Sequence, residues 1–174
     1  MLSHLAIRDI VLIERLDIDF QPGLSVLTGE TGAGKSILLD ALALALGARG
    51  DPRLVRQGAA QGQVTAAFDI AHDHPARMLI ADNGLDCEGD VILRRVQASD
   101  GRTRAFVNDQ PASVALLRDI GATLVEIHGQ HDDRALVDPA SHRALVDAFG
   151  GLQGEAAAVA TAHRSWRQAE RDLD

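Results

Sequence analysis

The sequence predicts an α/β fold, and three features carry that prediction. Short segments in which apolar and polar residues alternate recur along the chain, as in strands that bury one face. An apolar segment over residues 36–46 is long enough for a buried helix, and Gly47 follows where that helix would end. A glycine-rich octapeptide joins a strand expected over residues 24–28 to this helix.

The other elements are expected at short intervals along the chain. Strands are predicted over residues 2–7, 16–20, 24–28, 63–70, 90–96, 103–108 and 122–127. Helices are predicted over residues 36–46, 75–84, 111–120 and 141–149, and from residue 155 onward. In this interpretation Pro111 begins one helix and Gly121 ends it, while the glycines at 150 and 151 end the next.

Composition limits the class of protein. The 174 residues suffice for one domain, or for one lobe of a larger domain. With 46% hydrophobic and 24% charged residues the chain is globular in composition, and its apolar runs are too short to span a membrane. Cys87 is the single cysteine, which excludes an internal disulfide and fits a reducing compartment. No secretory leader is visible at the N-terminus, so we expect a cytoplasmic protein.

The charge pattern argues against indiscriminate binding of nucleic acid. The formal net charge is −8, although arginines gather at 49, 53 and 56 and again at 94, 95, 102 and 104. The simpler interpretation of the second group is a solvated face. Only one of the 17 cationic side chains is a lysine, and that lysine is Lys35, inside the glycine-rich octapeptide.

The last segment has a different pattern. Five apolar residues follow spacings of 3, 4, 3 and 4: Val159, Ala162, Trp166, Ala169 and Leu173. This is the a/d seam of a coiled coil, although an ordinary surface helix is the alternative. Because the pattern continues to the final residue, we expect a domain over residues 1–150 and the start of a coiled coil, cut within its helix, over 151–174.

The octapeptide GETGAGKS, residues 29–36, carries the clearest chemistry. It matches G-x-x-x-x-G-K-[ST], the Walker A phosphate-binding loop, between a strand and a helix as that motif requires. Its glycines let backbone N–H groups surround phosphate, and the positive end of the following helix adds to the attraction. Lys35 should reach the β- and γ-phosphates and Ser36 should bind Mg²⁺. The predicted nucleotide-binding residues here are Gly29, Glu30, Thr31, Gly32, Ala33, Gly34, Lys35, Ser36 and Ile37.

Three kinds of P-loop protein are compatible with this loop alone. A small-molecule phosphotransferase would need a complete site and a lid within 174 residues. A GTPase would need N-K-x-D, which a chain with one lysine lacks. An ATP-driven dimeric machine would need a Walker B acid and an L-S-G-G signature, but the nearest Walker B candidates, at 66–69 and 124–127, fit poorly and no signature is present. A non-catalytic nucleotide sensor is a further possibility.

Longer stretches resemble the N-terminal part of RecN, the bacterial SMC-like DNA repair ATPase family. They are HLAIRDIVLIERLDIDFQPGLSVLTGETGAGKSILLDALALALGAR, LVRQGA, GRTRAFVNDQPASVALLRDIG and LVEIHGQHD, in that order between residues 4 and about 138. The resemblance implies the N-terminal lobe of an ABC/SMC-type head that is split in sequence. A coiled coil and a C-terminal lobe with the signature and Walker B would follow, and two heads would enclose two ATP molecules as a homodimer that acts on DNA double-strand breaks.

The resemblance also implies site residues outside the Walker A loop. Gln130, within residues 128–133, matches the Q-loop glutamine, which binds Mg²⁺ and positions water near the γ-phosphate. Arg56 matches an arginine loop that approaches nucleotide or DNA, with Arg53 as a rival. Arg8 matches a position beside the nucleotide, but Asp9 replaces the usual Asn and makes a contact from that residue doubtful. Lys35 and Gln130 are the expected catalytic residues, and ATP and Mg²⁺ the expected ligands.

Overall fold

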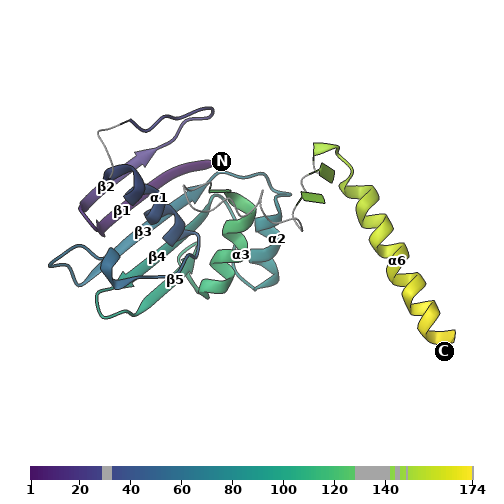
Figure 1. The fold of residues 1–174 in the computed structure, drawn as a ribbon. Coiled ribbons are helices and arrows are strands. Elements are labelled where there is room, and N and C mark those ends of the chain that lie inside the picture. Colours follow the sequence, from purple (N-terminus) through teal and green to yellow (C-terminus); the bar gives the residue numbers. More distant parts are fainter. Residues whose placement is uncertain (29–32, 128–141, 144–145, 148, 174) are drawn as a thin grey trace. The chain divides into compact units, whose positions relative to one another are not determined.

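The computed structural model describes residues 1–28, 33–127, 142–143, 146–147 and 149–173 (Figure 1). The chain divides into two compact units, Met1–Ile127 and His128–Asp174. Each unit has its own architecture.

An antiparallel sheet of six strands, in the order β2-β1-β3-β4-β5-β6, forms most of the first unit. The strands are β1 (Leu2–Ile10), β2 (Ile13–Asp19), β3 (Gln61–Phe68), β4 (Val91–Ala98), β5 (Thr103–Val107) and β6 (Gln110–Ala112). Five of the seven predicted strands are therefore confirmed, with ends that differ by a few residues.

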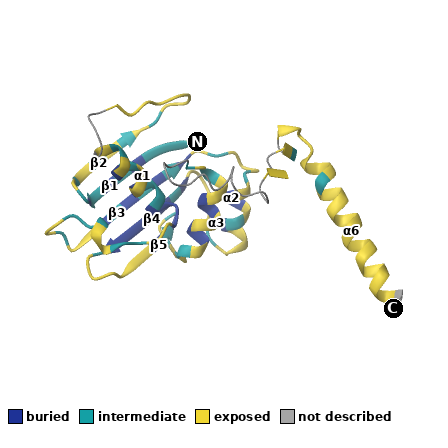
Figure 2. Cartoon of the chain, viewed as in Figure 1, coloured by how far each residue is buried: buried dark blue, intermediate teal, exposed yellow. Residues whose placement is uncertain are grey.

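Three helices and a short 3-10 turn complete the described part of the first unit. They are α1 (Ala33–Ala45), η1 (Pro52–Leu54), α2 (Pro75–Asp82) and α3 (Val114–Leu124). Because side chains alternate along a strand, one face of each inner strand points into the core and is fully buried (Figure 2). Ile7, Val64 and Leu93 are examples from β1, β3 and β4, and α1 lies across these three strands.

Two glycines allow α1 and α3 to pack closely. A Cβ on Gly121 would lie 2.8 Å from the Leu46 carbonyl oxygen, and one on Gly47 would lie 2.5 Å from the Arg118 amide nitrogen. Gly47 also has a φ of 90°, as expected of the residue after a helix. Gly121 is therefore a packing residue inside α3, and the prediction that it ends that helix is wrong.

The region around α3 departs from the sequence prediction at both ends. Pro111 does not begin the helix but lies in β6, opposite Phe106 of β5, where an edge strand tolerates a missing N–H. Asn108 and Asp109 have φ of 46° and 61° and form the tight turn between these strands. The helix begins after Ser113, whose hydroxyl accepts a hydrogen bond from the Leu116 N–H at 3.0 Å.

Two predicted strands are absent from the described residues. Residues 122–124 form the last turn of α3, and 125–127 have no regular structure, so the strand predicted over 122–127 is wrong. Residues 24–28 also have no regular structure, although their sequence is typical of a strand. Leu24 and Val26 are 94% and 72% exposed, because no described strand pairs with this segment or covers it.

Two arginines are buried in the first unit, in different surroundings. Arg77 of α2 donates to four backbone carbonyls, at distances of 3.0 Å to Ala71, 3.1 Å to Ile70 and 2.7 Å to Gly89, with Cys87 as the fourth. Arg95 of β4 is 1% exposed, and its Nη1 has no hydrogen-bond partner. The interpretation of the second arginine group as a solvated face is therefore wrong for Arg95.

The second unit contains α6 (Gln153–Leu173). Residues 142–143, 146–147 and 149 are helical as well, which agrees with the helix predicted over 141–149. In α6 the seam residues Val159 and Trp166 are 61% and 55% exposed, and the His163 and Trp166 rings lie 5.5 Å apart. Among the described residues, no helix combines the length and apolar character needed to cross a membrane.

Candidate functional site

The first turn of α1 places the end of the phosphate-loop motif at the N-terminus of a helix. Residues 33–36 belong to this turn, Ser36 is exposed and Lys35 is half-buried. A Cβ on Gly34 would meet no described atom within 4 Å, so packing does not require the glycine there. Gly29, Glu30, Thr31 and Gly32 lie outside the described residues. The described half of the motif therefore lies at the start of a helix, as the sequence predicts. The strand predicted before the motif is not present in the described residues.

A cavity of about 280 Å³ lies beside this turn. Its walls come from β2, from the segment before the phosphate loop and from α1: Ile13, Leu16, Leu27, Thr28, Gly34, Lys35 and Leu38. Apolar side chains with a few polar groups on one side are typical of a small-molecule site, and the volume is at the small end of such sites. The cavity can accept an apolar ring while Lys35 and the helix end attract an anion.

The polar groups at this turn suit a polyphosphate. The N-terminus of α1 carries a partial positive charge, and Lys35 adds a full one. Ser36 supplies a hydroxyl oxygen, which is a ligand type that Mg²⁺ accepts. No group of three His, Cys, Asp or Glu side chains in the described ranges could hold a metal ion. Of the predicted Mg²⁺ ligands, Ser36 lies among the described residues and Gln130 lies outside them.

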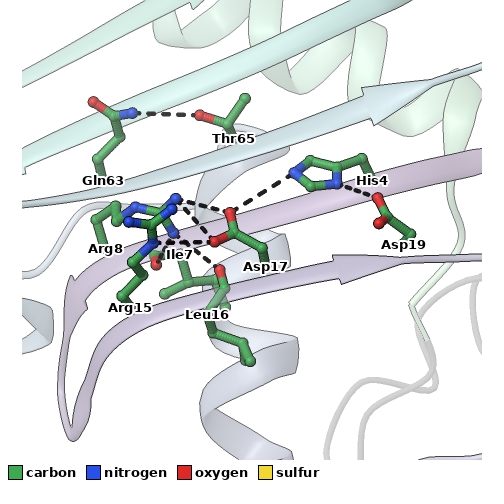
Figure 3. Close-up of polar contacts among 9 residues, drawn as sticks. All are labelled: His4, Ile7, Arg8, Arg15, Leu16, Asp17, Asp19, Gln63 and Thr65. Carbon is green, nitrogen blue, oxygen red and sulfur yellow. Dashed lines mark hydrogen bonds and ion pairs between the residues drawn. The ribbon is translucent and has the colours of Figure 1, made fainter.

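Arg8 of β1 is held by the neighbouring strand β2 (Figure 3). Its Nη2 donates to both carboxylate oxygens of Asp17, at 2.8 and 3.1 Å. Its Nη1 donates to the carbonyls of Ile7 and Leu16 at 2.9 and 3.1 Å. Leu16 also lines the cavity. The hydrogen bond from Arg8 to the Leu16 carbonyl therefore fixes one wall of the site. A direct contact between Arg8 and nucleotide stays a prediction.

Asp17 is the centre of a charged group on this face of the β1–β2 pair. It accepts from Arg8 and, at 3.3 Å, from Arg15, and the His4 Nε2 lies 3.9 Å away (Figure 3). The hydrogen bond from Arg8 is the main cause that lowers the pKa of Asp17 below its usual value, and the bond from Arg15 adds to it. His4 Nδ1 also lies 2.6 Å from Asp19. These contacts fix the register of β2 beside the cavity.

Arg56 is bound to the ends of β1 and β2 that flank their connecting turn. Its Nη2 lies 3.0 Å from Glu14 and its Nη1 3.7 Å from Asp9, while its backbone N–H donates to the Asp9 carbonyl at 2.9 Å. Asp9 has a φ of 50°, a conformation in which Asn and Asp are enriched. Asp is therefore a suitable residue for this backbone conformation. Arg53, the rival, instead pairs with Asp51 and is 89% exposed.

The structure brings some predicted residues together and leaves others untested. Lys35 and Gly34 line the cavity, and Arg8 donates to the carbonyl of Leu16 in its wall. Ile37 is buried in the core and is not among the lining residues. Gln130 and its predicted partners over 128–133 lie outside the described residues. Sequence reasoning missed Ile13, Leu16 and Thr28 as lining residues. The first two belong to β2, whose place beside α1 depends on its pairing with β1.

A known family matches most of the chain. The family described as AAA domain covers residues 4–129. DNA repair protein RecN of Xylella fastidiosa (strain 9a5c) is 40% identical over 167 residues, which are 96% of this chain and 30% of that protein. DNA repair protein RecN of Bacillus subtilis (strain 168) is 40% identical over 158 residues, 90% of this chain and 27% of that protein. The chain thus spans less than a third of the length of these relatives.

Solved structures show the same fold. The Smc head domain with an extended coiled coil from Pyrococcus furiosus, bound to the C-terminal domain of ScpA, superposes with a TM-score of 0.69 at 22% identity and covers 99% of this chain and 47% of that one. A chain from a study of ATP-driven dimerization and DNA stimulated activation of SMC ATPases gives 0.60 at 23% identity, covering 84% and 97%. With the motif, the sheet and the RecN relatives in agreement, the chain belongs to the AAA domain family and is RecN-like, with the fold of an SMC head.

Proposed function

We propose that this chain is the ATP-binding N-terminal lobe of a RecN-like ATPase head that acts in DNA double-strand break repair. The observation that carries the proposal is the GETGAGKS motif ending in the first turn of α1, beside a cavity that Lys35 lines. The RecN relatives and the SMC-head fold support it. The repair role is taken from the name of those relatives.

The chain's own residues have distinct tasks in this proposal. The N–H groups of residues 29–36 and the positive end of α1 hold the phosphates, and Lys35 binds the β- and γ-phosphates. Ser36 and Gln130 would supply oxygens to Mg²⁺, which would neutralise phosphate charge when it is bound. Arg8 and Arg56 hold the β1–β2 pair against the cavity. Gln130 also orients the attacking water.

A second lobe would complete the head. The exposed apolar residues Leu24 and Val26 alternate along a segment that has strand composition and no strand partner among the described residues. A strand from a C-terminal lobe would give this segment its backbone hydrogen bonds and bury those side chains. The same lobe would carry the signature and Walker B residues that the sequence lacks. Residues 1–150 would then form the first lobe and 151–174 the start of the intervening coiled coil.

The assembled protein would work as an ATP-clamped homodimer on DNA. Each ATP would be bound by the phosphate loop of one head and the signature of the other, so that loss of the γ-phosphate releases the dimer. The exposed seam of α6, with Val159 and Trp166, supplies an apolar stripe for a coiled-coil partner. We place this protein in the bacterial cytoplasm at the nucleoid, since its substrate is DNA.

Steady-state ATP hydrolysis by the purified 174-residue chain tests whether the head needs a C-terminal lobe for catalysis. We expect turnover near background, because the catalytic acid and the signature are missing from this chain. The matched variants are Lys35→Ala, which removes the phosphate-binding ammonium, and Arg164→Ala on the exposed helix α6. Turnover well above background that Lys35→Ala abolishes and Arg164→Ala leaves intact would contradict the half-head proposal. It would favour a self-contained phosphotransferase site.

A further inference from the structure

Residues 9–14 contain the end of β1, the turn after it and the start of β2, and we call this segment the β1–β2 corner. Asp9 and Val11 have φ of 50° and 49°, in the left-handed region. Asp tolerates such a φ, but for a β-branched residue such as Val it is a genuine outlier. A strained backbone of this kind persists only where surrounding contacts enforce it, and it is common beside ligand sites. The contacts that enforce the corner therefore show which residues support it.

The segment from Leu54 to Arg56 supplies the backbone contacts. The Val11 N–H donates to the Leu54 carbonyl at 2.8 Å, and the Arg56 N–H donates to the Asp9 carbonyl at 2.9 Å. An isolated β-bridge joins the two segments between these hydrogen bonds. The strained residues are thus fixed by a segment that lies more than 40 positions further along the chain.

Three charged side chains reinforce the same contact. We call them the Arg56 latch, and its members are Asp9, Glu14 and Arg56. The Arg56 Nη2 lies 3.0 Å from a Glu14 carboxylate oxygen, and its Nη1 lies 3.7 Å from one of Asp9. Since Asp9 precedes the turn and Glu14 follows it, Arg56 connects both sides of the corner.

The latch is unsuited to binding phosphate itself. It contains one cation and two carboxylates, so its net charge is −1 and it repels a polyphosphate. Arg56 is also not among the described residues that line the cavity beside α1. An effect of the latch on nucleotide binding would therefore pass through the corner that it holds.

The corner is joined directly to the cavity. Ile13 pairs with Ile10 where the turn closes, and Ile13 lines the cavity together with Lys35. A shift of the corner would consequently displace one wall of the site.

We propose that Glu14 is a positioning residue of the nucleotide site. It holds Arg56, and through Arg56 the strained corner, and it does not touch the nucleotide. This inference rests on the proposed function for its ligand. It makes an unusual demand, since removal of a negative charge near an anion site should weaken the binding of the anion.

Calorimetric titration of the 174-residue chain with Mg²⁺·ATP tests the proposal. The test variant is Glu14→Gln, and the matched control is Glu88→Gln, an exposed glutamate of the same unit. Each variant removes one negative charge. We expect Glu14→Gln to bind about threefold more weakly, because Glu14 is 73% exposed and such ion pairs contribute modestly. The control should change the affinity less than about 1.5-fold, since a distant exposed charge is screened.

Arg56→Ala separates a latch from a direct contact with phosphate. In a latch Arg56→Ala weakens binding as much as Glu14→Gln does, and the double variant is no weaker than either single one. If Arg56 instead binds phosphate and Glu14 competes for it, Glu14→Gln binds Mg²⁺·ATP more tightly. Tighter or unchanged binding by Glu14→Gln would overturn the proposal.

Hydrogen exchange tests the latch without nucleotide. The Val11 N–H should exchange about threefold faster in Glu14→Gln and in Arg56→Ala, because its bond to Leu54 opens more often. The Asn108 N–H, bonded to the Ile92 carbonyl at 2.9 Å, is the internal control and should not change. Unaltered exchange of Val11 in both variants would overturn the latch, whatever the affinities. Absence of Mg²⁺·ATP binding by the unaltered chain would instead contradict the proposed function, and with it the role of Glu14 in nucleotide binding.

Discussion

Arg77 and Arg95 are both buried arginines of the first unit, and their surroundings differ. Arg77 directs its guanidinium at four backbone carbonyls from the segments that flank α2. Arg95 has one side-chain acceptor, Thr103, and a neighbouring cation, Arg118. A buried charge stabilises a fold only when its donors have hydrogen-bond acceptors. Arg77 therefore stabilises the first unit, whereas the burial of Arg95 destabilises it.

Arg77→Met gives the largest expected effect on this comparison. It leaves four carbonyls without their donor, and we expect the free energy of unfolding in urea to fall by about 3 kcal/mol. The same substitution at Arg95 is the matched control, and we expect it to change stability by less than about 1 kcal/mol, because it removes a poorly matched charge. Equal losses of unfolding free energy in the two variants would show that Arg77 and Arg95 contribute equally to stability.

Thr103→Val sharpens the account of Arg95. It removes the acceptor of the 2.7 Å bond from Arg95 Nε, and we expect a loss of about 1–2 kcal/mol in urea unfolding. In a chain that already carries Arg95→Met the loss should shrink by half or more, because the donor is gone. If the loss is the same in both backgrounds, the stability effect of Thr103 arises from its own bond to the Val96 carbonyl.

Arg8→Ala tests a half-buried arginine and has the smallest expected effect. The Arg8 bond lowers the pKa of Asp17 from 3.8, so its contribution to stability is present above that pH and is lost as the pH falls through the lowered value. The variant should therefore be less stable than the parent at neutral pH and should lose less on acidification below pH 3.8. Thermal unfolding measured from pH 7 to pH 2 gives both the difference in stability at neutral pH and the loss on acidification. Parallel pH profiles would show that the Arg8–Asp17 pair does not contribute.

Local patterns predicted most of the first unit, because alternation and turn residues determine antiparallel neighbours. The strands β1 to β5 were predicted from alternation and turn residues, and α1 was predicted from its apolar segment and the glycine that follows it. The sequence could not show that Gly121 packs against Leu46, so it was interpreted as a helix end. Residues 24–28 have the composition of a strand, but no described strand pairs with them. Composition could not predict this, because the stability of a strand depends on its neighbour as much as on its own residues.

The candidate site was predictable where it depends on a motif and unpredictable where it depends on pairing. Lys35 follows from the motif alone, whereas Leu16 lines the cavity because β2 folds back beside β1. The two arginine groups were visible in the sequence, but only the fold brings Gly50 close to Arg95 and Gly101 close to Pro52. Alternation along β4 also separates Arg94, which stacks 4.0 Å over Phe106, from the buried Arg95.

Calorimetric titration of the 174-residue chain with Mg²⁺·ATP tests the central claim most directly. We expect one weak site per chain, with affinity reduced at least about tenfold by Lys35→Ala, because one charge-assisted contact to phosphate is worth about 1.5–3 kcal/mol. Arg164→Ala on α6 should leave the affinity unchanged. Binding that is equally tight in the Lys35→Ala variant, or no binding by the unaltered chain, would contradict a phosphate-binding site at the start of α1.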